Sequence, residues 1–187
     1  IIVKPSLRAD SVISFTTPSF RDFVSQLAEL SGIKIKCLED YLNAIDIRLN
    51  LFSDAGCEYA DHSLDAGFRF VPVSSGEASS LFGKLLQTGE ISPAETVKLQ
   101  SYVLLFMGRC YARRNWNMQL HIGAKRDTNT QLRTRLGPAG GYAAIGSACD
   151  VNSLVCFLDT LNEEDSLPRT ILYTLNPADN AVFATLT

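Results

Sequence analysis

Apolar residues recur every three or four positions in several stretches of the chain, which is the spacing of one face of an α-helix. This pattern predicts amphipathic helices over residues 18–30, 38–55 and 151–161, a short helix and a turn over residues 74–91, a long buried helix over residues 92–114, and a more polar helix over residues 127–136. Ser92, Pro93 and Glu95 have the order of an N-cap, a first helical residue and a capping-box partner. The start of the long helix is therefore marked by the sequence itself.

Four shorter apolar runs are rich in β-branched and aromatic residues and are too short for helices. They cover residues 1–3, 57–60, 116–120 and 169–175. Strands that alternate with helices in this way predict right-handed βαβ units and a parallel sheet whose strands are adjacent in sequence order. Four such strands would be half of a β/α barrel, but a doubly wound sheet has the same alternation, so the pattern leaves both topologies open.

Polar residues gather where the predicted strands end. Just past the four strands lie Arg8 and Asp10, Asp61 and His62, His121, and Asn176. Barrels and doubly wound sheets both keep their chemistry at the carboxyl ends of their strands. We therefore expect Arg8, Asp61 and His121 to open onto one concave surface.

Each of these residues has a structural alternative. A single histidine is more often structural than functional, but the shared strand-end position of His62 and His121 favours a site. Asp61 could act as a general base or accept a hydrogen bond from a sugar hydroxyl, or it could cap the next turn. Arg8 could bind a substrate carboxylate through two parallel hydrogen bonds, or it could be a surface residue paired with Asp10.

Arg126 has a weaker claim to a site. The segment Lys125-Arg126-Asp127 reads as a solvated helix start, although Arg126 follows His121 closely enough to reach the same site. No His-x-His, no His-Glu-x-x-His and no cysteine cluster occurs, so no metal-binding motif is recognisable in this chain.

Composition narrows the class of protein. The 187 residues suffice for one domain, and we treat residues 1–187 as a single unit. A net charge of -3 gives no basic surface for nucleic acid, and the apolar run at residues 103–107 is too short to span a bilayer. The five scattered cysteines indicate buried, reduced thiols and a cytoplasmic location. The absence of an initiator Met and the apolar last residues suggest an internal segment of a longer chain.

Several segments together resemble the uronate isomerase (glucuronate isomerase) family of the metal-dependent amidohydrolase superfamily. Residues 56–65, Gly-Cys-Glu-Tyr-Ala-Asp-His-Ser-Leu-Asp, resemble its Gly-Cys-x-x-Ser-Asp-His-x-Leu. Residues 119–126, Gln-Leu-His-Ile-Gly-Ala-Lys-Arg, resemble its Gln-x-His-Ile-Gly-Ala-x-Arg, and residues 136–138 and 167–180 are similar to later blocks. Residues 7–10, Leu-Arg-Ala-Asp, resemble its Trp-Arg-Pro-Asp with two replacements that concern pocket shape more than chemistry.

The resemblance implies an α/β fold that is part of a (β/α)8 TIM-type barrel, with the third to sixth strands and helical insertions. It implies aldose-ketose isomerisation of D-glucuronate to D-fructuronate and of D-galacturonate to D-tagaturonate. Arg8 and Arg126 would bind the substrate, and Asp61 and His121 would assist ring opening or proton transfer. The family's zinc, or another divalent metal, is held by a His-x-His and an Asp with no counterpart here, so the ligands would lie outside this chain.

Two other functions stay open at this stage. One is a metal-dependent hydrolase of the same superfamily, and the other is a non-catalytic protein that binds sugar acids on half a barrel. Half a barrel would also leave two open strand edges and a bare inner face, which favour self-association. We therefore expect the isolated chain to be oligomeric or aggregation-prone and inactive, and the complete protein to be a homo-oligomer.

Overall fold

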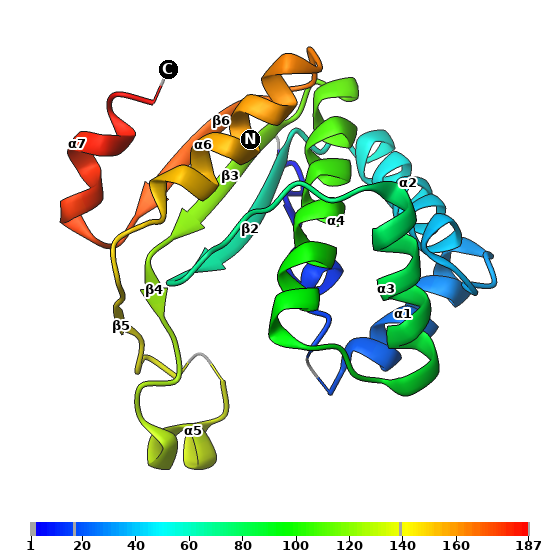
Figure 1. The fold of residues 1–187 in the computed structure, drawn as a ribbon, viewed down its shortest axis with the longest axis horizontal. Coiled ribbons are helices and arrows are strands. Elements are labelled where there is room, and N and C mark those ends of the chain that lie inside the picture. Colours follow the sequence, from blue (N-terminus) through cyan, green and yellow to red (C-terminus); the bar gives the residue numbers. More distant parts are fainter. Residues whose placement is uncertain (1–2, 17, 139, 187) are drawn as a thin grey trace.

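The computed structural model describes residues 3–16, 18–138 and 140–186. Its centre is a four-stranded sheet in the order β1-β2-β3-β6, in which every pairing is parallel (Figure 1). The strands are β1 (Leu7–Arg8), β2 (Tyr59–Asp65), β3 (Asn117–Ile122) and β6 (Arg169–Thr174). The prediction of parallel strands that are adjacent in sequence order is confirmed.

Helices fill every connection between these strands. They are α1 (Phe20–Ser31), α2 (Leu38–Asp54), α3 (Ser75–Thr88), α4 (Pro93–Arg113) and α6 (Val151–Glu163), with the short α5 (Thr130–Leu136) and α7 (Asn180–Phe183) and the 3-10 helices η1 (Asp10–Ile13) and η2 (Pro177–Asp179). Figure 1 shows α1 to α4 gathered beside the sheet and α5 projecting away from it. None of the helices in the described ranges is long and apolar enough to cross a membrane.

The two faces of the sheet differ in their cover. On β2 and β3, the buried side chains are Ala60, His62, Leu64, Met118, Leu120 and Ile122. This outer face packs against the helices, and α4 contacts both β3 and α6. The alternate residues of β2 and β3 form the inner face, because successive side chains of a strand point to opposite sides. These residues are less buried than those of the outer face.

A glycine allows the two outer helices to approach closely. A Cβ atom built on Gly108 of α4 would lie 2.7 Å from Cδ1 of Leu161 on α6, which is closer than side chains pack. Leu161 is itself fully buried, so it has little room to move away. The close contact between α4 and α6, which helps to cover the outer face, depends on the absence of a side chain at Gly108.

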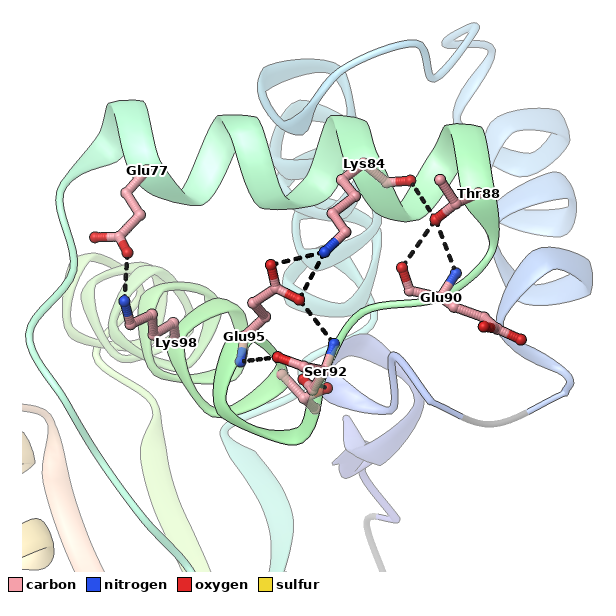
Figure 2. A network of polar contacts seen from close by, with 8 residues as sticks. Glu77, Lys84, Thr88, Glu90, Ser92, Glu95 and Lys98 are labelled. Atoms are coloured by element: carbon pink, nitrogen blue, oxygen red, sulfur yellow. Dashed lines mark hydrogen bonds and ion pairs between the residues drawn. The ribbon is translucent and has the colours of Figure 1, made fainter.

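The predicted start of α4 is confirmed in detail. The hydroxyl of Ser92 accepts a hydrogen bond from the backbone N–H of Glu95, and the Glu95 carboxylate accepts one from the backbone N–H of Ser92. Figure 2 shows this capping box together with two ion pairs that join α3 to α4, Lys84 with Glu95 and Glu77 with Lys98. The Lys84 ammonium and the bonds from Ser92 lower the pKa of Glu95 to about 2.

The predicted boundaries of three strands and one helix were wrong. The strand expected at residues 1–3 lies largely outside the described residues, Val3 is not in a strand, and the segment that pairs with β2 is Leu7–Arg8. Strands β2 and β3 continue through the polar residues that were taken as their ends: Asp61 and His121 lie on the less covered inner face, and His62 is buried on the outer face. The polar helix begins at Thr130 rather than at residue 127, since Asn129 is its N-cap.

A second, two-stranded sheet was not predicted. Strand β4 (Ala124–Lys125) pairs antiparallel with β5 (Ala144–Ile145). Each strand has only two residues, so neither carries a readable alternation of apolar and polar positions. The hairpin carries α5 and leads the chain from β3 back towards α6.

The cysteines only partly follow the prediction of buried thiols. All five are free, and Cys57 and Cys110 are buried in the core. Cys149 and Cys156 are partly buried, and Cys37 is exposed. The prediction was therefore wrong for Cys37, which lies just before α2 as its N-cap residue.

Candidate active site

Three predicted site residues, Arg8, Asp61 and His121, project from the inner face of the sheet, within the strands and not beyond them, and Arg126 follows β4. Arg8 is the register partner of Asp61 across β1 and β2, and Ser63 is the register partner of His121 across β2 and β3. In a parallel sheet, register partners lie on the same face. The structure thus brings Arg8, Asp61 and His121 onto one surface, although all three are strand residues.

Asp61 and His121 approach each other directly. The Nδ1 atom of His121 lies 3.3 Å from Oδ1 of Asp61. The His121 side chain is 47% exposed and that of Asp61 is 18% exposed, so the imidazole is the more accessible partner. A carboxylate beside Nδ1 favours the tautomer with its proton there, which leaves Nε2 as a proton acceptor.

Two arginines converge on one serine. The Nη2 atoms of Arg8 and Arg126 lie 3.3 Å and 3.0 Å from the hydroxyl oxygen of Ser63. Carboxylates hold both guanidinium groups: Arg8 Nε donates to Asp10 at 2.8 Å, and Arg126 Nε donates to both oxygens of Asp65 at 2.9 Å. The hydrogen bond to Asp10 raises the pKa of Arg8, so this cation stays charged.

A cleft of about 610 Å³ opens beside these arginines. Its lining includes Arg8, Ser63 and Arg126 together with residues 141–143. This volume is within the usual range for sites that hold small ligands. Asp61 and His121 do not line the cleft and lie on the adjoining part of the inner face, two residues from Ser63 along β2 and opposite it on β3.

His62 lies on the other side of the sheet from Asp61. It is fully buried, and its Nε2 atom is 2.8 Å from the hydroxyl of Tyr111 on α4. Burial lowers the pKa of His62 to about 4, so the imidazole is neutral near pH 7. Asn176, the other polar strand-end residue, caps η2 and donates to the backbone oxygen of Gly146. Both residues have structural roles here.

No metal centre is formed by the described part of the chain. Its histidine, cysteine, aspartate and glutamate side chains include no group of three or more that could hold a metal ion. The Asp61–His121 pair alone offers too few ligands for a zinc ion, which takes at least three from the protein. These residues therefore do not fit a metal site.

Sequence reasoning missed four residues of this surface. Ser63 and Asp65 hold the arginines, while Tyr173 and Gln119 lie beside His121. Ser63 follows Asp61 by two residues, which is the period of one strand face, whereas Asp65 comes after a register shift in β2. That signal was present in the sequence but was hidden by the assumption that the strand ended at Ala60.

A parallel β/α sheet with convergent charged groups on its inner face is the arrangement of an enzyme built on a β/α barrel. Comparison with known proteins makes the class specific. The glucuronate isomerase family model matches residues 1–187, and the chain belongs to this family.

The relatives agree on the family. The chain is 41% identical over 186 residues to the uronate isomerase of Caldanaerobacter subterraneus subsp. tengcongensis, covering 100% of this chain and 40% of the relative. It is 39% identical to that of Caldicellulosiruptor bescii, covering 98% and 39%. The chain thus spans about 40% of the length of the curated relatives it matches.

Solved structures give the same result for the fold. The crystal structure of uronate isomerase from Thermotoga maritima superposes with a TM-score of 0.89 at 26% identity, covering 98% of this chain and 40% of that one. Glucuronate isomerase from Caulobacter crescentus gives a TM-score of 0.84 at 26% identity, covering 95% and 36%. The four parallel strands therefore match part of the larger, barrel-type fold of these uronate isomerases.

Proposed function

We propose that the complete protein is a uronate isomerase that converts D-glucuronate to D-fructuronate and D-galacturonate to D-tagaturonate. The observation that carries this proposal is the convergence of Arg8 and Arg126 on Ser63, beside the Asp61–His121 pair. A sugar acid needs one site for its carboxylate and another for the proton that moves. Family membership supports an isomerase over a hydrolase or a simple binding protein.

In this proposal, Arg8 and Arg126 bind the anionic end of the substrate. Guanidinium groups match a carboxylate in geometry and form charge-assisted hydrogen bonds with it. Their nitrogens already meet at one hydroxyl oxygen, so a carboxylate oxygen near Ser63 would find donors from both sides. Asp10 and Asp65 hold the two side chains in place before the substrate arrives.

Asp61 and His121 handle the proton. Isomerisation opens the sugar ring and moves a proton between C2 and C1 of the open chain. In ring opening, with Nδ1 of His121 facing Asp61, Nε2 can take the proton of the C1 hydroxyl while the bond between C1 and the ring oxygen breaks, and can return that proton to the ring oxygen. The carboxylate stabilises the imidazolium that forms, as an acidic neighbour does for any protonated histidine.

The remaining parts of the proposal concern the whole protein. A zinc ion or another divalent metal would stabilise negative charge on the substrate oxygens, and its ligands would lie outside this chain. The protein is proposed to be a cytoplasmic homo-oligomer with no nucleic-acid or membrane partner. The net charge of -3 supports the proposed absence of a nucleic-acid partner.

A coupled assay tests the function. The complete protein is incubated with D-glucuronate or D-galacturonate, and the ketose product is reduced by an excess of a ketouronate reductase while NADH absorbance is followed. Turnover of either sugar acid, strongly reduced but still measurable in His121→Gln, is the expected result. Absence of turnover with both sugars and with added zinc, manganese or magnesium would reject the proposal.

A further inference from the structure

A tyrosine on the last strand covers one face of the His121 ring. Tyr173 and His121 are register partners on β6 and β3. Their ring centroids are 4.6 Å apart and their planes differ by 5°, so the rings are stacked in parallel. Tyr173 was predicted only as part of the strand at residues 169–175, and it has no role in the proposed isomerase chemistry.

Tyr173 is itself held by a second contact. Its hydroxyl donates a hydrogen bond of 2.9 Å to Oε1 of Gln119. Gln119 precedes His121 by two residues on β3 and therefore lies on the same face of the sheet. Tyr173 thus contacts two side chains of β3: its ring stacks on His121 and its hydroxyl bonds to Gln119.

These contacts restrict the orientation of the imidazole. Rotation of a histidine ring about its Cβ–Cγ bond has a broad energy profile, so the ring nitrogens of a free side chain have no fixed direction. The stack on Tyr173 sets the plane of the His121 ring, and Asp61 beside Nδ1 selects one of the two ways the ring can lie in that plane. The Nε2 atom has no hydrogen-bond partner among the described residues, which leaves it for a substrate.

We propose that Tyr173 is a positioning residue for His121. The stacked ring and the hydrogen bond to Gln119 keep the imidazole in the orientation that pairs Nδ1 with Asp61 and leaves Nε2 for proton transfer. Tyr173 acts through His121 and does not need to touch the substrate. The kinetic consequence rests on the proposed isomerase function, whereas the orientation of the ring does not.

Two variants separate the ring from the hydroxyl. In the complete protein, Tyr173→Leu removes the stacking partner, and Tyr173→Phe keeps it while losing the bond to Gln119. We expect Tyr173→Leu to lower kcat about tenfold, since small errors in orientation are costly to proton transfer, with KM changed by less than about twofold because the arginines are intact. Tyr173→Phe should recover most of kcat.

A double mutant tests whether Tyr173 acts through His121. If it does, Tyr173→Leu should lower kcat in the wild-type background but add no further loss in the His121→Gln background. An equal loss in both backgrounds would overturn the proposal, because Tyr173 would then act independently of the histidine. Failure of Tyr173→Phe to recover activity would also overturn it, because the stacked ring would not be the active feature.

The matched control is Tyr59. It lies on the same face as Asp61, two residues before it at the start of β2, and its side chain is as exposed as that of Tyr173, at 42% against 41%. Its ring is not stacked on His121, which pairs with Tyr173. Tyr59→Leu should therefore leave kcat and the His121 signal described next unchanged, and a loss like that of Tyr173→Leu would point to general damage of the sheet.

A spectroscopic readout works without any activity. The ring current of a stacked tyrosine shifts the carbon-bound imidazole protons of His121 upfield in the proton NMR spectrum, and the signal is assigned by its absence in His121→Gln. We expect this shift to disappear in Tyr173→Leu and to persist in Tyr173→Phe. An unchanged signal in Tyr173→Leu would overturn the proposal, and this result stands even if the protein isomerises neither sugar acid.

Discussion

The Nε2 atom of His62 lies 2.8 Å from the hydroxyl oxygen of Tyr111, and both side chains are fully buried between β2 and α4. The Nδ1 atom of His62 is also buried and has no hydrogen-bond partner within the described ranges of the chain. Protonation would place an uncompensated charge in this apolar layer. The folded protein therefore favours the neutral imidazole, which joins the outer face of β2 to α4 through Tyr111.

This contact predicts a loss of stability in acid. Burial lowers the pKa of His62 from 6.5 to about 4 in the folded state, so the unfolded state binds more protons between these values. The stabilisation is fully present above pH 6.5 and is lost as the pH falls towards 4, at a cost of roughly 3 kcal/mol in the free energy of unfolding. Urea denaturation of the complete protein at several pH values measures it.

The variant for this prediction is His62→Gln, which can still reach Tyr111 but does not titrate. It should be less stable than the wild type at pH 7 and should lose less stability on acidification. His121→Gln is the control, since His121 is half exposed and makes no such buried contact. An identical pH profile for the wild type and His62→Gln would contradict the assignment.

Arg8→Ala should weaken capture of the sugar acid by the complete protein. Loss of one charge-assisted hydrogen bond costs about 2 kcal/mol, which corresponds to a decrease of about 30-fold in kcat/KM, mainly through KM. The kcat/KM of Arg8→Lys should lie between those of the wild type and Arg8→Ala, because lysine keeps the charge but not the planar pair of donors. Steady-state kinetics with D-glucuronate measures both.

Arg109→Ala is the control for loss of an arginine. Arg109 also pairs with a carboxylate, that of Glu164, but it does so where α4 meets the end of α6, away from the cleft. Its replacement should leave KM unchanged. If Arg8→Ala behaves like Arg109→Ala, Arg8 does not bind the substrate.

Ser92→Ala should destabilise the protein by about 1 kcal/mol, because it removes the oxygen that accepts from the backbone N–H of Glu95 at the start of α4. Ser92→Gly should cost less, since glycine is tolerated at this position. Ser80→Ala is the control: the Ser80 hydroxyl bonds only within its own helix α3, so its loss should have almost no effect. Equal urea midpoints for all three variants would show that the cap is dispensable.

The isolated chain of residues 1–187 should self-associate and should not isomerise D-glucuronate. Strands β1 and β6 are the edges of the described sheet, and Ile171, Tyr173 and Leu175 expose apolar surface beside one of them. Unpaired edges and exposed apolar patches favour association. Light scattering and the coupled assay check this, and a monomeric, active chain would contradict it.

The local pattern of apolar and capping residues was sufficient to predict where the helices lie. The interval 38–55 was predicted and Leu38–Asp54 was found, and the capping box at Ser92 has the expected bonds. These features depend on residues within a few positions of one another, so the sequence contains all the information needed. The order of the strands also followed from sequence, because right-handed βαβ connections leave few alternatives.

Strand ends and faces were harder to predict. The neighbours Asp61 and His62 looked like one polar group in the sequence, but they lie on opposite sides of the sheet. A strand places successive side chains on opposite faces, and only packing against α4 decides which of the two is buried. The apolar run at residues 1–3 was preferred to Leu7–Arg8 because two residues carry no readable period.

The sequence by itself determined the blocks shared with the family, the extent of most helices and the parallel order of the strands. Only the tertiary structure decided that Arg8 and Arg126 meet at Ser63 and that Tyr173 stacks on His121. Arg8 and Ser63 are 55 residues apart in the chain, and Arg126 and Ser63 are 63 apart. Contacts at such separations follow from the register between strands, which backbone hydrogen bonds and helix packing set together and which no local pattern encodes.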